Sequence, residues 1–257
     1  MVFEQDVQIQ AADGLADAAV IAPGPAKTGR WPGVIMLTDT FGLRESHRQV
    51  ARRLAQAGVG YTVVLPNLFY RSGRPPFFPP PIAFSAPDTQ ARAAELRATL
   101  TPDIVARDAA AYVDFVTRQL DLVAPGPIAV VGYCFSGAIA VRMAATRPEA
   151  IGMAASFHGG RLATDDINSP HLLLPQIKAQ LYFGHARNDR SMPAEAIDKL
   201  EQALAVRDGR YGSEIYEAGH GWTVPDHPAY NEAEAERAFA KLVDLLTHTL
   251  VQRLGAS

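Results

Sequence analysis

The chain has 257 residues, of which 48% are hydrophobic, with one cysteine and a net charge of −3 at pH 7. This length and hydrophobic content predict one α/β domain over residues 1–257, and the lack of a basic excess argues against nucleic acid or an anionic membrane surface as a partner. No apolar run reaches the ~18 residues of a membrane span, and a single cysteine excludes an intramolecular disulfide and favours a reducing, cytoplasmic compartment.

The N-terminal part alternates between strand and helix patterns. Residues 3–10 alternate apolar and polar side chains and residues 15–22 form a second β-like run, which together predict an antiparallel hairpin at the edge of a sheet. A buried strand at 33–37 (GVIML), an amphipathic helix at 45–57 and a buried strand at 61–65 (YTVVL) follow. This order predicts a mostly parallel central sheet with helices on both faces.

The alternation stops over residues 66–101. This segment contains the run RPPFFPPPI at 74–82, which can form neither a regular helix nor a central strand. Its two phenylalanines on a stiff backbone predict either a lid over an apolar site or a surface loop packed on the core. A short helix is predicted over residues 91–100.

The C-terminal part returns to strands and helices. Residues 128–131 (IAVV) read as a central buried strand, and the helix after them ends before Pro148. The remaining predicted elements are helices at 102–120, 193–206 and 232–254, and strands at 151–157, 179–183 and 211–216.

A tight turn, GYCFSG at 132–137, joins the central strand to its helix. It reads as a nucleophile elbow with Cys134 where serine usually stands, although Ser136 occupies the place of the usual second glycine. The turn would expose Cys134 at a helix N-terminus, where unpaired N–H groups and the helix dipole favour the thiolate. The alternative is that Cys134 is a small buried hydrophobic residue at a strand end.

Three residues follow predicted strands in the order nucleophile, acid, base: Cys134, Asp189 and His220. This is the chain order of α/β-hydrolases. His220 would hold Cys134 as thiolate and later protonate the leaving group, while Asp189 would fix the imidazole tautomer. The competing candidates also lie near strand ends: His158 and His185 for the base, and Asp165 and Asp166 for the acid.

Further groups complete the predicted site. The backbone N–H of Phe135, directly after the nucleophile, and that of Thr40, in the first strand-to-helix loop, would form an oxyanion hole. Tyr133 and Trp222 are candidates for lining the substrate pocket, with aromatic packing near a turn as the alternative. A reaction that needs only a nucleophile, a base and oxyanion donors requires neither a metal nor an organic cofactor.

Four motifs together resemble the dienelactone hydrolases, the carboxymethylenebutenolidase-like proteins, over most of the chain. They are the Gly-Tyr-Cys elbow, FHGG at 157–160, the Gly-His…Asp loop at 184–189 and GHGWTVP at 219–225. The resemblance implies an α/β-hydrolase fold and assigns a Cys-His-Asp triad to Cys134, His220 and Asp189. It also implies that an acidic residue in the oxyanion-side turn, here Asp39, holds the resting thiol until substrate arrives.

One departure from the family concerns substrate recognition. Dienelactone-specific members carry an arginine a few residues after the catalytic histidine that binds the substrate carboxylate, and the segment after His220 has none. Substitutes for it could be Arg71, Arg74, Arg92, Arg187 or Arg190, unless the substrate is not a dienelactone.

The sequence therefore predicts a hydrolase that acts on small ester or lactone substrates through a thioester acyl-enzyme. The alternative is a ligand-binding or redox-sensing protein of the same fold. The lone cysteine argues against a redox cycle, because the chain contains no resolving thiol. The sequence leaves the physiological substrate and the oligomeric state open.

Overall fold

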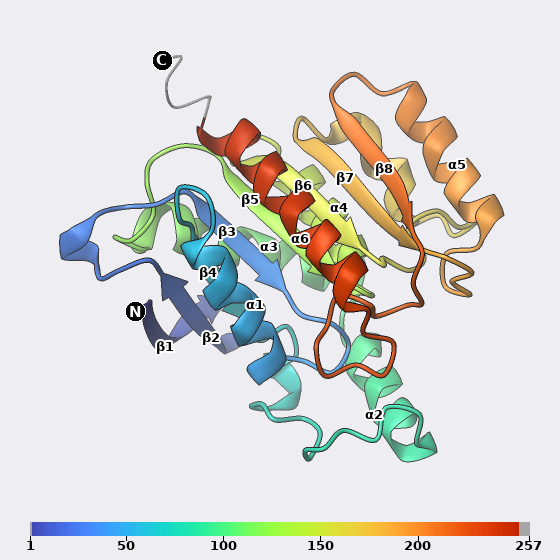
Figure 1. Ribbon diagram of the computed structural model, residues 1–257, viewed down its shortest axis with the longest axis horizontal. Helices are drawn as coiled ribbons and strands as arrows, with labels where there is room; N and C mark the ends of the chain where they lie inside the picture. The colour runs from blue at the N-terminus through green and yellow to red at the C-terminus, as the bar shows by residue number, and fades with distance from the viewer. Residues whose placement is uncertain (1, 252–257) are drawn as a thin grey trace.

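A computed structural model describes residues 2–251, and its eight strands form one sheet in the order β1-β2-β4-β3-β5-β6-β7-β8 (Figure 1). The strands β1 (Phe3–Ala11) and β2 (Gly14–Ala22) pair as an antiparallel hairpin, and β2 pairs antiparallel with β4 (Thr62–Pro66). All other neighbouring strands run parallel, as far as the edge strand β8 (Tyr211–Tyr216). The predicted mostly parallel sheet with an N-terminal hairpin is confirmed.

The central strands carry almost unbroken apolar sequences because both of their faces are covered. Every residue of the strands at the centre of the sheet is buried, whereas β8 exposes part of its length. This is why short apolar runs in the sequence located these strands. Their bounds are Gly33–Leu37 for β3, Ile128–Tyr133 for β5, Ile151–Phe157 for β6 and Gln180–Ala186 for β7.

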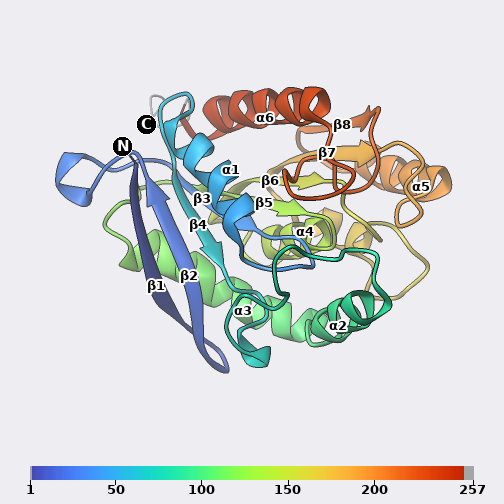
Figure 2. The ribbon, with the colours of Figure 1, turned by 60° about the horizontal axis from the view of Figure 1, so that its bottom comes forward.

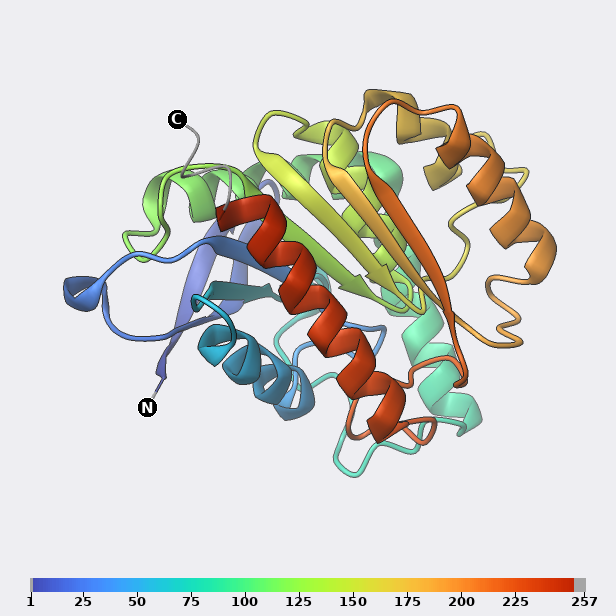
Figure 3. The same cartoon turned by 45° about the horizontal axis from the view of Figure 1, so that its top comes forward.

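Helices cover both faces of the sheet (Figures 2 and 3). One face packs against α1 (Glu45–Gln56) and α6 (Glu232–Leu246) in one apolar cluster. A second cluster packs the other face against α3 (Pro102–Asp114), α4 (Ser136–Thr146) and α5 (Ala194–Ala205). Within residues 2–251 no helix combines the length and the apolar character needed to cross a membrane.

Residues 66–101 leave the sheet after β4 and lie beyond the carboxyl ends of the central strands, where α2 (Pro87–Ala98) is visible in Figure 1. This helix begins earlier than predicted because proline is favoured in the first helical turn. Phe78 of the proline-rich run is buried, and its ring centroid lies 5.3 Å from that of Phe41. The run therefore packs aromatic side chains beside the turn that follows β3.

Two helices end differently from their predicted form. The segment predicted as one helix to residue 120 is α3 followed by a π-helical turn at Phe115–Gln119, and α6 is followed by another at Thr247–Val251. Each turn contains a threonine whose hydroxyl donates to the carbonyl oxygen four residues earlier, which disturbs the regular ladder. The predicted end of the last helix at Leu254 lies outside the described residues.

Candidate active site

Cys134 occupies the turn between β5 and α4 with a left-handed φ of 59°, a strained value for a residue with a side chain. A β-carbon on Gly132 would come within 2.2 Å of the carbonyl oxygen of Ser136, and one on Gly137 within 2.1 Å of a serine hydroxyl of β6. The hydroxyl of Ser136 is buried and accepts the N–H of Tyr133 at 2.9 Å. The elbow thus tolerates serine in place of its usual second glycine because the hydroxyl has partners inside the turn.

The structure brings together the three predicted catalytic side chains at the carboxyl edge of the sheet. Nε2 of His220 lies 3.0 Å from Sγ of Cys134, and its Nδ1 lies 2.6 Å from Oδ2 of Asp189. The other oxygen of Asp189 accepts the backbone N–H of Ser191 at 2.8 Å and its hydroxyl at 2.7 Å. Ser191 therefore orients the carboxylate of Asp189, and the imidazole of His220 points at the sulfur.

The hydrogen-bond partners of His220 favour its protonated form. Burial alone would lower the pKa of His220, but its hydrogen bonds to Asp189 and Cys134 raise it to about 10. Burial also opposes ionisation of Asp189, whose pKa is nevertheless lowered by His220 and Ser191. At neutral pH the imidazole therefore carries a proton on each nitrogen, donating one to the carboxylate and the other to the sulfur.

Two backbone donors near the sulfur are free. Among the described residues, neither the N–H of Thr40 nor that of Phe135 has an acceptor, whereas the N–H of Phe41 binds Asp39 at 2.9 Å. Both free donors belong to residues that line a cavity with Cys134. Phe135 also sits at the N-terminus of α4, where the helix dipole adds to the attraction for an anion.

Asp39 lines the same cavity as Cys134, but its carboxylate is already bound. Arg44 donates to its two oxygens at 2.6 and 2.8 Å and also holds Asp226 at 2.8 and 2.9 Å. No hydrogen bond joins Asp39 to the sulfur within residues 2–251. Arg44 thus links the loop before α1 to the loop that follows His220.

The charge of Asp39 is set by these neighbours. Burial would raise the pKa of Asp39, but His47, Arg44 and the N–H of Phe41 together lower it. Burial lowers the pKa of His47 to about 4, so His47 is neutral at pH 7. The permanent counter-charge to Asp39 is therefore the guanidinium of Arg44.

Two cavities meet at Cys134 and His220, which line both of them. The first, of about 420 Å³, is walled by the rings of Phe41, Phe84 and His227, and we call it the aromatic arm. The second has a volume of about 700 Å³. We call it the basic arm after its arginine side chains: Arg97, Arg142 and Arg161.

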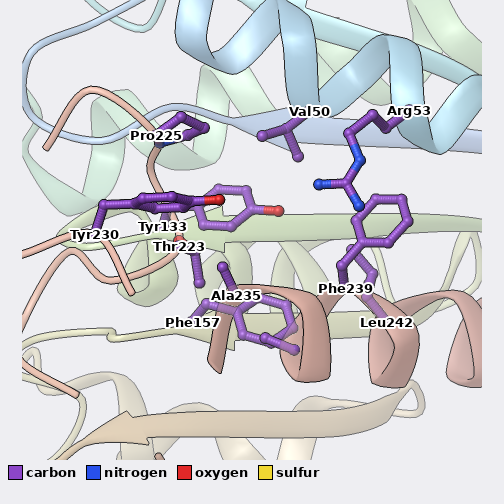
Figure 4. Close-up of a pocket in the computed structure, with 11 residues that line it drawn as sticks. Val50, Arg53, Tyr133, Phe157, Thr223, Pro225, Tyr230, Ala235, Phe239 and Leu242 are labelled. Carbon is purple, nitrogen blue, oxygen red and sulfur yellow. The ribbon is translucent and has the colours of Figure 1, made fainter. Parts of the chain in front are cut away.

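Tyr133 and Trp222 lie elsewhere than predicted. Tyr133 lines a separate cavity of about 30 Å³ between α1 and α6 (Figure 4), and Trp222 is fully buried with its ring stacked 4.8 Å from that of Tyr216. Neither residue lines the aromatic arm or the basic arm. This placement does not support the substrate-binding role predicted for them, because other residues line both arms at Cys134.

The arginine candidates also lie away from the sulfur. None of the five proposed substitutes lines either arm, and four of them pair with carboxylates: Arg71, Arg74, Arg92 and Arg187. Sequence analysis missed Arg97, which lies near the end of α2 and donates to the hydroxyl of Thr40 at 3.0 Å. Its position depends on how the segment 66–101 folds back, which no local pattern in the sequence indicates.

The competing base and acid candidates have other partners or none. His158 is buried and bonded to the backbone N–H of Cys134, and His185 is buried without a hydrogen-bond partner among the described residues. Asp165 pairs with Lys199, and Asp166 accepts a backbone N–H of its own turn. No group of three or more metal-binding side chains is found in the part of the chain that the structure describes.

A sequence comparison identifies the family of the chain. A family model described as "Dienelactone hydrolase family" matches residues 17–250. A carboxymethylenebutenolidase of Rhodococcus opacus is 29% identical over 216 residues, covering 79% of this chain and 76% of that protein. The crystal structure titled "Putative Dienelactone Hydrolase", from Klebsiella pneumoniae, superposes with a TM-score of 0.82 at 22% identity, covering 96% of this chain and 99% of that one. A dienelactone hydrolase-like promiscuous phosphotriesterase from metagenomic libraries superposes with a TM-score of 0.76 at 21% identity, covering 97% and 99%.

Proposed function

The chain belongs to the dienelactone hydrolase family and has its α/β-hydrolase fold, and from this premise we propose that it hydrolyses small esters or lactones through a thioester acyl-enzyme on Cys134. The observation that carries the proposal is the 3.0 Å contact between Sγ of Cys134 and Nε2 of His220, with Asp189 at 2.6 Å behind the ring. A nucleophile, a base and an orienting carboxylate in hydrogen-bond reach are the requirements of covalent acyl transfer.

Acylation begins from the thiolate and imidazolium. The sulfur attacks the ester carbonyl carbon, a C–S bond forms, and the carbonyl oxygen becomes an oxyanion that the N–H groups of Thr40 and Phe135 stabilise. When the oxyanion collapses, the C–O bond of the ester breaks. His220 gives its Nε2 proton to the departing alkoxide, leaving a thioester on Cys134 and a neutral imidazole.

Deacylation reverses these roles. Neutral His220 accepts a proton from water, and the resulting hydroxide attacks the thioester carbonyl. The C–S bond then breaks, the acid leaves, and Cys134 departs as thiolate beside a protonated His220. Asp189 keeps the imidazole in the tautomer that accepts at Nε2 and supports the positive charge in both half-reactions.

Other parts of the proposal concern the surroundings of the triad. Asp39 would modulate the thiol through its charge in the shared cavity.

Residues 66–101 would act as a lid within a single domain, because Phe84 and Arg97 of this segment line the arms at Cys134. The substrate would be a small molecule, and the lone free thiol supports a cytoplasmic location.

A steady-state experiment tests the function. We expect the purified protein to hydrolyse a short-chain chromogenic aryl ester, before and after treatment with a chelator, and Cys134→Ala to lose this activity. Activity that Cys134→Ala retains in full, or that is lost with the chelator and restored only by a metal, would overturn the proposed mechanism. An inactive native protein across varied esters would instead favour a ligand-binding role.

A further inference from the structure

We propose that His158 is a positioning residue that ties the nucleophile turn to the loop carrying the catalytic base, and thereby fixes the contact between Cys134 and His220. The inference rests on the proposed function for its meaning, because it assigns a role within that site. Its contacts, however, are independent of any substrate.

The backbone places His158 where both parts of the site can be reached. It follows β6 directly with a left-handed φ of 41°, and its N–H donates to the carbonyl oxygen of Gly184 on β7 at 2.7 Å. The residue is 1% exposed. A left-handed conformation at a non-glycine residue persists only where surrounding contacts hold it, so the backbone of His158 is fixed at the end of the sheet.

Both ring nitrogens of His158 are engaged, and the contacts fix the tautomer. Nδ1 lies 3.0 Å from the backbone N of Cys134 and accepts its N–H, which is shared with the carbonyl oxygen of Phe157. The proton of a neutral ring must then reside on Nε2, which lies 2.7 Å from the hydroxyl oxygen of Thr223 and donates to it. Thr223 follows His220 by three residues, so one imidazole bridges the nucleophile turn and the base loop.

The electrostatic surroundings keep this bridge neutral. Burial lowers the pKa of His158 well below its ordinary value, the charges of His220 and His227 act in the same direction, and the carboxylates of Asp39 and Asp189 oppose them without outweighing them. The rings of His158 and His220 meet edge to face, with centroids 5.2 Å apart. A neutral His158 can therefore support His220 without repelling the imidazolium that the proposed reaction requires.

The alternative is that His158 is only a well-packed core histidine. In that case its replacement would lower stability and leave the reactivity of the folded site unchanged. The bridge predicts more, because both of its ends lie on the chain segments that set the 3.0 Å separation of sulfur and Nε2. Loosening either end should weaken the stabilisation of the thiolate.

Four variants cut or keep the bridge selectively. His158→Asn retains an acceptor near the position of Nδ1 and removes the donor at Nε2, whereas His158→Gln retains a donor near Nε2 and removes the acceptor. Thr223→Val removes the hydroxyl at nearly constant volume. Thr223→Ser keeps the hydroxyl and serves as the matched control.

The readout is the rate of iodoacetamide alkylation of Cys134 against pH in the folded protein, which needs no substrate. In Thr223→Val and His158→Asn we expect the pH of half-maximal alkylation to rise by roughly one unit, a tenfold loss of thiolate in the acidic range. Thr223→Ser should return the curve to that of the native protein. With an ester substrate, Thr223→Val should lower kcat with little change in KM, because Thr223 lines neither arm.

A double variant makes the test decisive. Because His158→Asn and Thr223→Val cut the same hydrogen bond, the combined variant should be no worse than the poorer single variant. Fully additive losses, or alkylation curves that superimpose on the native curve while only the melting temperature falls, would overturn the inference. Since alkylation is measured without turnover, failure of the bridge and failure of the proposed hydrolase function give different results.

Discussion

At the scale of single residues, the proton on His220 governs the proposed chemistry. Burial alone would lower the pKa of His220, yet Asp189 and Cys134 raise it to about 10. A histidine with a raised pKa stays protonated as the pH rises past its ordinary value and loses the proton only near the new one. The group that protonates the leaving alkoxide is therefore available across neutral and mildly alkaline pH.

This predicts the basic side of the pH profile. We expect kcat/KM for an aryl ester to stay level through neutral pH and to fall as the pH approaches about 10, where the imidazolium of His220 is lost. In Asp189→Asn the fall should begin at lower pH, and kcat/KM should drop by roughly 10³- to 10⁴-fold because the tautomer is no longer fixed. Asp165→Asn, on an exposed acid, is the control. A native profile that falls near pH 7 would contradict this assignment.

A second residue-scale prediction concerns Asp39. Asp39→Asn removes a negative charge from the cavity of Cys134, so alkylation of the free enzyme should speed up while ester turnover falls. Asp226→Asn is the matched control, because it removes the other carboxylate held by Arg44 but does not line that cavity. Superimposable alkylation curves for native protein and Asp39→Asn would rule out thiol modulation and leave the triad proposal untouched.

The proximity of the triad residues could be predicted from the sequence, but the partners of His158 could not. Cys134, Asp189 and His220 follow strands, and carboxyl ends of parallel strands converge at one edge, so their proximity follows from chain order. The partners of His158 could not be predicted, because they depend on a left-handed backbone and on the path of the 219–230 loop. The buried ring of Trp222, which lines neither arm, shows that nearness in sequence to a catalytic residue does not place a side chain in the cavity.

At the scale of elements, the elbow depends on a close backbone approach at Gly132. A methyl group at Gly132 would lie 2.2 Å from a backbone oxygen in the first turn of α4, which cannot move aside as a flexible side chain could. A methyl group at Gly219, beside His220, would have as its nearest neighbour the β-carbon of Ala229 at 3.7 Å, an ordinary contact. The site therefore has no room for a β-carbon at Gly132 but has room for one at Gly219.

This difference gives a stability prediction. Gly132→Ala should lower the free energy of unfolding by about 3 kcal/mol or more, the upper range for overpacking a tight site, and should slow alkylation of Cys134. Gly219→Ala should change stability by less than about 1 kcal/mol. Chemical denaturation of both variants and of the native protein measures these free energies of unfolding. Equal losses at the two positions would show that the elbow is not unusually tight.

Among the elements, the buried strands were the easiest to predict and the segment 66–101 the hardest. Strands covered on both faces must be apolar throughout, so their sequences are unambiguous. The proline-rich run and α2 have few apolar positions, with Ala93 and Leu96 the buried ones of α2. Their path is set by aromatic contacts with distant residues, which no local pattern encodes.

At the scale of the whole molecule, several histidines are buried in neutral form. Burial lowers the pKa of His47 and of His185 to about 4. Because both are protonated more readily in the unfolded chain, their contribution to stability is present above about pH 6.5 and is lost as the pH falls toward 4. The fold should therefore weaken in mild acid.

His185 isolates this effect, since neither of its nitrogens has a hydrogen-bond partner among the described residues. In native protein the free energy of unfolding should fall between pH 6.5 and 4.5, with roughly 2 to 3 kcal/mol of the loss due to this one side chain. The free energy of unfolding of His185→Phe should fall less than that of native protein, by this amount. For His248→Gln, on an exposed side chain, the fall should equal that of native protein. Urea titrations at both pH values test this, and parallel losses in His185→Phe and native protein would contradict it.

In the proposed reaction the Cys134 thiolate attacks the substrate and becomes acylated. Rapid mixing with a chromogenic ester at low pH, followed by acid quenching and intact mass measurement, tests it most directly. We expect one acyl group on the native protein, located at Cys134 after proteolysis, and none on Cys134→Ala. An active enzyme whose acyl group sits on another residue, or whose Cys134→Ala variant is acylated and turns over normally, would contradict the account.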